Sequence, residues 1–238
     1  MRIVECRSPN HDERPAGAAI DILVLHYTGM KTADEALARL CDPVARVSAH
    51  YTIDRDGRIY AHVPEERRAW HAGVSYWAGE TNVNARSIGI ELVNPGHEFG
   101  YVPFAQEQIA ALTELAQGIL SRHPVPPTRV VGHSDVAPAR KTDPGELFPW
   151  QRLAGFGIGV WPKHATAARD VDQSELAAKL SRYGYGLPPH ADVPLGTVIT
   201  AFQRHFRQTG VNGEWDAECD ALLDALLALA SDPSTGPG

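Results

Sequence analysis

The fold class follows from one short segment, Ile22-Leu23-Val24-Leu25-His26-Tyr27-Thr28-Gly29. Its four consecutive apolar residues predict a buried strand, and the Tyr-Thr-Gly that follows predicts the opening of a loop. His26 therefore stands at the end of a strand, where its side chain is expected to face a cleft.

Strand-like and helix-like segments alternate on both sides of this strand. Further strands are predicted at residues 49–53, 57–63, 87–93 and 129–133, with the first strand covering 20–26. Helices are predicted at 32–40, capped by Thr32, and at 104–122. The Asp54-Arg55-Asp56-Gly57 segment is typical of a hairpin turn. This pattern predicts an α/β fold with a central mixed sheet and helices packed on it.

The C-terminal quarter of the chain has a different pattern. Three amphipathic helices are predicted at residues 174–183, 196–206 and 216–230, after a small and polar stretch. We therefore predict a catalytic domain at 1–162, a linker at 163–171, a three-helix domain at 172–231 and a disordered tail at 232–238. A unit of about 60 residues is marginal alone, so it should lean on the first domain. Its expected core is Phe202, Phe206, Leu222, Leu223, Leu226 and Leu227.

Composition limits the classes of function. The chain has 238 residues, of which 43% are hydrophobic, and a net charge of −7 at pH 7. This length allows one sizeable core and a small second module. The negative charge and the lack of Lys/Arg clusters argue against nucleic acid or an acidic membrane surface as the main partner. A neutral or mixed-charge substrate is expected, and oligomeric state is not predicted.

Cysteine usage and the N-terminus bear on the compartment. Cys6, Cys41 and Cys219 are widely spaced and odd in number, which predicts neither a disulfide framework nor a thiolate zinc site. The N-terminus has no apolar signal region, and no run of about 18 apolar residues occurs. The sequence predicts a protein without a membrane segment, located in the cytoplasm, with the periplasm as the alternative.

Three polar residues stand where strands or loops would present a metal ligand. Besides His26, these are His133, which follows the apolar Val130-Val131-Gly132, and Asp143, which lies in the Lys-Thr-Asp-Pro-Gly loop. Three such ligands with an open fourth position would form a hydrolytic zinc site. Asp135 is a rival ligand, and its alternative role is to cap the loop after His133.

Six segments, in order along residues 20–162, carry a family resemblance. They are Leu25-His26-Tyr27-Thr28, Val47-Ser48-Ala49-His50-Tyr51, Arg68-Ala69-Trp70-His71-Ala72-Gly73, Ser87-Ile88-Gly89-Ile90-Glu91-Leu92, Gly132-His133-Ser134-Asp135 and Arg140-Lys141-Thr142-Asp143-Pro144-Gly145. With them the chain resembles the zinc-dependent N-acetylmuramoyl-L-alanine amidases of the type 2 amidase family, relatives of phage lysozyme-like amidases and peptidoglycan recognition proteins. The C-terminal region is similar to three-helix peptidoglycan-binding domains.

The resemblance implies one Zn²⁺ ion held by His26, His133 and Asp143. It favours Asp143 over Asp135, because Asp143 occupies the family's ligand position. Glu91 is the expected general base: alternation along residues 87–93 puts Ser87, Gly89 and Glu91 on the face opposite Ile88, Ile90 and Leu92. Lys141 is expected to stabilise the oxyanion.

Substrate contacts are expected from four residues near the predicted cleft. We predict His71 at the cleft rim, Trp70 as a flat face for a sugar ring, and Asn84 and Arg86 as polar contacts, with Arg86 holding a carboxylate. Gly89 is expected to leave room for substrate. Trp70 and Trp77 could each stack on a sugar or belong to the core.

The resemblance implies hydrolysis of the amide between the lactyl group of N-acetylmuramic acid and L-alanine in peptidoglycan fragments. The expected substrates are 1,6-anhydro-muropeptides from cell-wall recycling. Two alternatives are a non-catalytic muropeptide-binding protein and an exported amidase that acts on intact wall. The presence of all three ligand positions and Glu91 argues against the binding protein.

Overall fold

The structure is a computed structural model that describes residues 3–162 and 172–231. The predicted linker at 163–171 and the predicted tail at 232–238 lie outside these residues. The division of the chain into domains at that linker therefore stays a prediction. Within the described ranges, no helix has the length and apolar character needed to cross a membrane.

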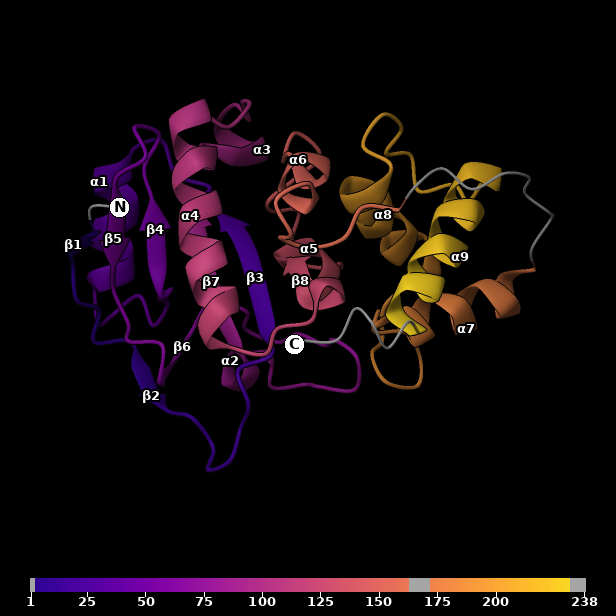
Figure 1. Ribbon diagram of the computed structural model, residues 1–238, viewed down its shortest axis with the longest axis horizontal. Helices are drawn as coiled ribbons and strands as arrows, with labels where there is room; N and C mark the ends of the chain where they lie inside the picture. The colour runs from indigo at the N-terminus through magenta and orange to yellow at the C-terminus, as the bar shows by residue number, and fades with distance from the viewer. Residues whose placement is uncertain (1–2, 163–171, 232–238) are drawn as a thin grey trace.

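A six-stranded mixed sheet forms the centre of the molecule (Figure 1). Its strands run in the order β1 (Ile3–Glu5), β5 (Ile59–Ala61), β4 (Tyr51–Ile53), β7 (Ser87–Leu92), β3 (Ile22–Tyr27) and β8 (Val130–Gly132). All neighbours are parallel except β4 and β5, which the predicted turn at Asp54 and Gly57 joins as an antiparallel hairpin. The predicted α/β class is confirmed. A two-stranded sheet of β2 (His11–Glu13) and β6 (Arg67–Ala69) lies apart from it.

One face of the central sheet is covered by α4 (Gln106–Arg122), as Figure 1 shows. Leu23 and Leu25 of β3 and Ile88 and Ile90 of β7 are fully buried on this face. They share one apolar cluster with the inward-facing residues of α4, namely Ile109, Leu112, Leu115, Ala116 and Ile119. Because strand residues alternate in direction, their neighbours in sequence must point to the opposite face.

The opposite face meets the C-terminal helices α7 (Gln173–Tyr183), α8 (Leu195–Phe206) and α9 (Ala217–Ser231), which gather beyond the β8 edge in Figure 1. Ile22 and Val24 of β3 belong to the same apolar cluster as Phe202 of α8. All six residues of the expected C-terminal core are buried. Trp77 is 1% exposed and packs edge-on against Tyr183 and Tyr185, which makes it a core residue. The C-terminal helices therefore lean on the rest of the protein, as expected.

Helix α1 (Ala33–Cys41) begins as predicted, because the Thr32 side chain accepts a hydrogen bond from the Glu35 amide. Several short elements have no predicted counterpart, because periodicity needs a longer window than three to five residues. Besides β1, β2 and β6, these are α2 (Val83–Arg86), α3 (Gly96–Phe99), the 3₁₀ helix Pro127–Arg129, α5 (His133–Val136) and α6 (Trp150–Ala154). The last predicted strand ends one residue early, at Gly132, because α5 begins at His133.

Candidate metal centre

The carboxyl ends of three adjacent parallel strands meet at the candidate site. His26 of β3 lies directly opposite Glu91 of β7 in the register of the sheet. Strand β8 flanks β3 on its other side and ends at Gly132, so His133 enters the same region as the first residue of α5. Parallel neighbours in register point to the same face, so the topology brings the two histidines and the carboxylate together.

The three predicted ligands form one buried cluster. The Nδ1 atoms of His26 and His133 are 2.9 Å apart, and each lies 3.1 Å from Oδ2 of Asp143. The residues are only 1%, 3% and 5% exposed, respectively. The Ser134 amide donates a hydrogen bond to the Asp143 carbonyl, which fixes the Asp143 loop against α5. Donor atoms on a tetrahedral zinc lie about 3.3 Å apart, so the cluster has the dimensions and the donor types of such a site.

A chain of hydrogen bonds determines where His26 carries its hydrogen. Ser87 Oγ donates to the Val83 carbonyl, so it can only accept from Nε2 of His71, 3.1 Å away. His71 Nδ1 is then an acceptor, and His26 Nε2 donates to it at 3.0 Å. Burial, followed by the charge of His26, lowers the pKa of His71 well below its usual value, which keeps this ring neutral. The bare nitrogen of a neutral His26 is therefore Nδ1.

His133 is oriented in the same sense. Its Nε2 atom lies 3.1 Å from the Ala72 carbonyl, which can only accept, so Nε2 holds the hydrogen and Nδ1 is bare. Two nitrogen lone pairs and a carboxylate oxygen thus converge on one point, an arrangement that a cation stabilises. Burial, and then His133, lower the pKa of His26 to about 4. Although burial acts to raise the pKa of Asp143, the two histidines hold it well below its usual range.

Glu91 lies beside this cluster as a half-buried residue, with its Oε2 atom shielded from solvent. Its Oε2 atom has no hydrogen-bond partner among the described residues. Burial, and then the charge of Asp143, raise the pKa of Glu91 well above its usual value, while Lys141 opposes the shift. A buried carboxylate oxygen without a partner is costly to keep, which points to a ligand or water that it meets in the working protein.

These groups open into a pocket of about 600 Å³. His133, Asp143 and Glu91 line it together with Lys141, and Trp70 forms part of its wall. Tyr27, Arg39, Leu40, Phe99 and Thr142 are further lining residues. The pocket therefore has charged residues at its base and apolar and aromatic residues in its walls. This lining suits a ligand with both a polar amide and sugar or peptide groups.

His71 lines the pocket, and its contact with substrate stays a prediction. It is 9% exposed, and both of its ring nitrogens are engaged, one with His26 Nε2 and the other with Ser87 Oγ. Gly89 makes room for this ring and not for substrate: a Cβ there would lie 2.5 Å from the His71 ring. Both residues thus help to position His26. The alternation of the β7 strand revealed its two faces but not which neighbour fills them.

Asn84 and Arg86 lie elsewhere. The Asn84 side chain accepts hydrogen bonds from the backbone amides of His71 and Ala72, so it holds the loop that orients both histidines. Arg86 forms ion pairs with Asp21 and Glu80. It precedes β7, whereas Glu91 lies five residues further on, or roughly 16 Å along the strand. Its guanidinium is therefore committed at the opposite end of the sheet.

Asp135 does not belong to the cluster of His26, His133 and Asp143, and instead links the core to the C-terminal helices. Its Oδ2 atom accepts from the Gly132 amide at 2.7 Å, which caps the start of α5, and lies 2.7 Å from Nδ1 of His205. The Tyr185 hydroxyl donates to Oδ1. Neither of these two partners was predicted. The position of Tyr27 was not predicted either: its hydroxyl lies 2.9 Å from Thr142 Oγ1, beside the Asp143 loop. Tyr27 directly follows His26 in the resemblance segment, which was the available signal.

Comparisons with known proteins agree with this site. The family model described as N-acetylmuramoyl-L-alanine amidase matches residues 16–146. The amidase AmiD of Escherichia coli K12 is 44% identical over 230 residues, which cover 87% of this chain and 82% of AmiD. The 1,6-anhydro-N-acetylmuramyl-L-alanine amidase AmpD of Haemophilus influenzae is 37% identical over 171 residues, 63% of this chain and 91% of AmpD.

Two solved structures extend the likeness over nearly the whole chain. AmiD from E. coli, in complex with anhydro-N-acetylmuramic acid-L-Ala-D-γ-Glu-L-Lys, has a TM-score of 0.80 at 42% identity and covers 91% of this chain and 92% of its own. AmpDh3 from Pseudomonas aeruginosa, in complex with an anhydromuramic pentapeptide, has a TM-score of 0.79 at 36% identity, with coverages of 91% and 94%.

Proposed function

The chain belongs to the N-acetylmuramoyl-L-alanine amidase family and is a hydrolase of that class, and from this we propose that its substrates are 1,6-anhydro-muropeptides. The bond cleaved is the amide between the lactyl group of the muramic acid and L-alanine. Two observations support this choice of fragment. The AmiD and AmpDh3 structures each hold an anhydromuramic peptide, and the AmpD relative is named for the same anhydro sugar.

We propose that His26, His133 and Asp143 hold one zinc ion. The support is the convergence of two bare imidazole nitrogens and one carboxylate oxygen, all within 3.1 Å of one another and shielded from solvent. This convergence is the observation that carries the proposed function. Zinc bound there would acidify a water molecule and polarise the amide carbonyl. Two neutral imidazoles and one carboxylate would leave the site with a net positive charge.

Glu91 is the proposed general base and acid. It takes a proton from the attacking water and returns it to the departing amine, so the net reaction adds one water across the amide bond. The support is positional: Glu91 lies opposite His26 in the sheet, lines the pocket and has a buried oxygen with no hydrogen-bond partner in the described ranges. A residue that only maintained the fold would be expected to satisfy that oxygen within the protein.

Lys141 and Trp70 complete the proposed site. Lys141 lies two residues before Asp143 and lines the same pocket, so its ammonium can stabilise the negative charge that develops on the carbonyl oxygen. Trp70 offers its ring in the pocket wall, where it would pack against a sugar. No covalent enzyme intermediate is needed, because the nucleophile is water.

We further propose that residues 172–231 form a separate three-helix unit, peptidoglycan-binding-like, that now serves as a packing partner. The support for packing is the apolar cluster that its helices share with Ile22 and Val24 of β3, together with the hydrogen bonds that Tyr185 and His205 make to Asp135. Cytoplasmic recycling is the accompanying proposal for the compartment, and cell fractionation tests it. Protein found entirely outside the inner membrane would overturn that proposal.

The decisive experiment is a substrate panel. Purified protein is incubated with intact sacculi, ordinary muropeptides and 1,6-anhydro-muropeptides, with and without a chelator, and products are identified by mass spectrometry. We expect free stem peptide from the anhydro fragments, lost with chelator and restored by added zinc. Cleavage of sacculi in preference to fragments would overturn the proposed substrate. Bound zinc without cleavage of any substrate would indicate a binding protein instead.

A further inference from the structure

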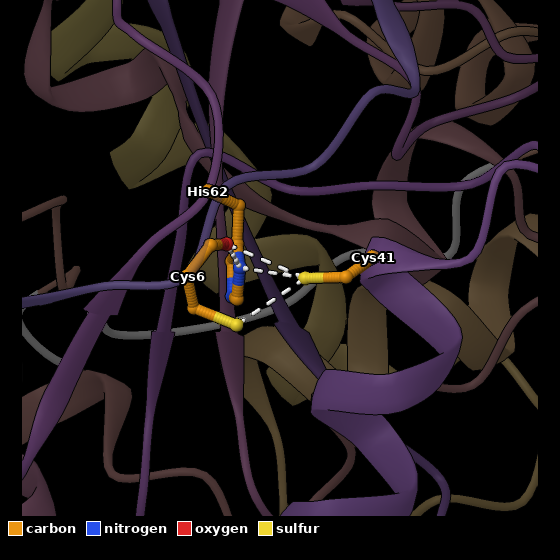
Figure 2. Close-up of side chains that lie close together, drawn as sticks. All are labelled: Cys6, Cys41 and His62. Carbon is orange, nitrogen blue, oxygen red and sulfur yellow. Dashed lines mark hydrogen bonds between the residues drawn. The ribbon is translucent and has the colours of Figure 1, made fainter.

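A second cluster of ligand-type side chains lies at the other edge of the sheet. Cys6 directly follows β1, Cys41 is the last residue of α1, and His62 directly follows β5. The two Sγ atoms are 3.3 Å apart, and Cys41 Sγ lies 3.8 Å from Nδ1 of His62. Figure 2 shows the three side chains converging from these three elements. None of them lines the candidate active-site pocket.

The histidine of this cluster presents a protonated nitrogen to the sulfurs, which cannot bind a metal. His62 Nδ1 lies 2.7 Å from the Cys6 carbonyl, which can only accept, so the hydrogen sits on the nitrogen nearest the sulfurs. His62 Nε2 is 2.8 Å from Thr52 Oγ1, from which it accepts. Two sulfurs on a tetrahedral zinc would also lie roughly 3.8 Å apart, further than the 3.3 Å observed. The geometry favours direct contact between the sulfurs.

The two thiols are accessible, whereas the third cysteine is not. Cys6 and Cys41 are partly exposed, whereas Cys219, a residue of α9, is buried with 0% exposure. Burial, and then the neighbouring Cys6, raise the pKa of Cys41 to about 12. Because the thiolate is the nucleophile in exchange, the Cys41 thiol is slow to react at neutral pH but remains within reach of a small oxidant.

We propose that Cys6 and Cys41 form a disulfide by exchange with a small-molecule disulfide such as oxidised glutathione. One thiolate attacks the oxidant, which releases one thiol and leaves a mixed disulfide. The second thiolate then attacks that protein sulfur and releases the second thiol. The pair loses two electrons and two protons, and the oxidant is reduced to two thiols. The sulfurs must approach by roughly 1 Å to reach a bond of about 2.0 Å.

The bond would reinforce one wall of the active-site pocket. Leu40, next to Cys41, lines that pocket. The segment after β1 already holds this end of α1: Ser8 Oγ donates to the Leu40 carbonyl, and Asn10 Nδ2 donates to the carbonyls of Asp42 and Val47. A disulfide one residue from Leu40 adds a covalent link where hydrogen bonds already fix the geometry. It should therefore stabilise this wall without moving it.

The test is oxidation of the full chain. The protein is incubated at pH 8.5 with either oxidised or reduced glutathione. Peptide mass spectrometry then identifies linked cysteines, and thermal unfolding gives the Tm. We expect a Cys6–Cys41 peptide, a mass lower by about 2 Da and a Tm higher by roughly 5–10 °C in the oxidised sample. Amidase turnover should stay within about twofold, so this outcome is separable from failure of the proposed function.

Variants identify the residues responsible. Cys6→Ser and Cys41→Ser should each abolish the mass loss and the Tm rise, whereas Cys219→Ser, the matched control, should keep both. Thiols that remain free with excess oxidant, yet are alkylated by iodoacetamide, would overturn the proposal. So would binding of a second zinc equivalent that is lost in Cys41→Ser. If a serine variant fails to fold, peptide mapping of the oxidised wild-type chain shows by itself whether the Cys6–Cys41 disulfide forms.

Discussion

The chain contains two clusters of three ligand-type side chains, and they differ in where their hydrogens point. His26, His133 and Asp143 present two bare nitrogens and a carboxylate to one point. In the thiol cluster of Cys6, Cys41 and His62, the histidine directs a hydrogen towards the backbone next to the sulfurs. In both clusters the potential ligand atoms lie close together. The surrounding acceptors decide which cluster suits a metal, because they fix the histidine tautomers.

The two clusters also occupy different parts of the sheet. The cluster of His26, His133 and Asp143 lies at the carboxyl ends of β3 and β8, at 5% exposure or less. The thiol cluster lies at the β1 and β5 edge, and its cysteines are partly exposed. Buried donors with fixed tautomers are preorganised for a cation, whereas accessible thiols are suited to exchange with solvent species.

Removing one histidine from each cluster should give the largest difference between the two clusters, in both bound zinc and turnover. We expect His26→Ala to lose bound zinc and to lower kcat/KM by more than about 10³-fold, because zinc supplies the polarising charge. His62→Ala should retain one zinc and stay within a few fold of the wild type. Metal content by mass spectrometry and turnover of an anhydro-muropeptide measure both. Equal loss of zinc in the two variants would contradict the comparison.

Glu91→Gln should uncouple metal binding from chemistry in the first cluster. The amide keeps the size of the side chain but cannot take a proton, so we expect kcat to fall by about 10²–10⁴-fold with zinc retained. Glu98→Gln is the matched control, because Glu98 lines the same pocket without touching the cluster. Activity of Glu91→Gln close to the wild type would show that the base is misassigned.

His71→Phe tests whether neighbouring hydrogen bonds make the difference between the clusters. The ring shape is kept, but the acceptor for His26 Nε2 is lost. We expect zinc affinity to fall by roughly 10–100-fold, as for other residues that orient metal ligands. Competition with a chromogenic chelator measures the affinity, and excess zinc should restore turnover. Unchanged affinity would show that the His26 tautomer is fixed by other means.

The smallest effect concerns the pH response of the thiol cluster. Because burial raises the pKa of Cys41 to about 12, the reactive thiolate is a minor species at pH 7 and grows as the pH rises. Alkylation of Cys41 should therefore accelerate by about tenfold per pH unit between pH 7 and 10. Peptide mass spectrometry after timed iodoacetamide treatment follows it. A rate that levels off between about pH 9 and 10 would show an ordinary exposed thiol.

Local patterns in the sequence predicted much of this protein. The apolar run before His26 predicted a buried strand, and alternation along residues 87–93 predicted that Glu91 leaves the apolar face. Thr32 and the Asp54 to Gly57 turn gave two boundaries correctly. These features depend on backbone periodicity and on side chains a few residues apart, so each can be predicted from a single short segment.

Only the tertiary structure decided which side chains meet. It paired Arg86 with Asp21 at the far end of the sheet, bonded His71 to His26 in the pocket, and linked Asp135 to His205. It also brought Cys6 to Cys41, although 35 residues separate them and their spacing predicted no pairing. Strand order and helix docking set these contacts, and they arise from burying apolar faces over the whole chain, which no local pattern encodes.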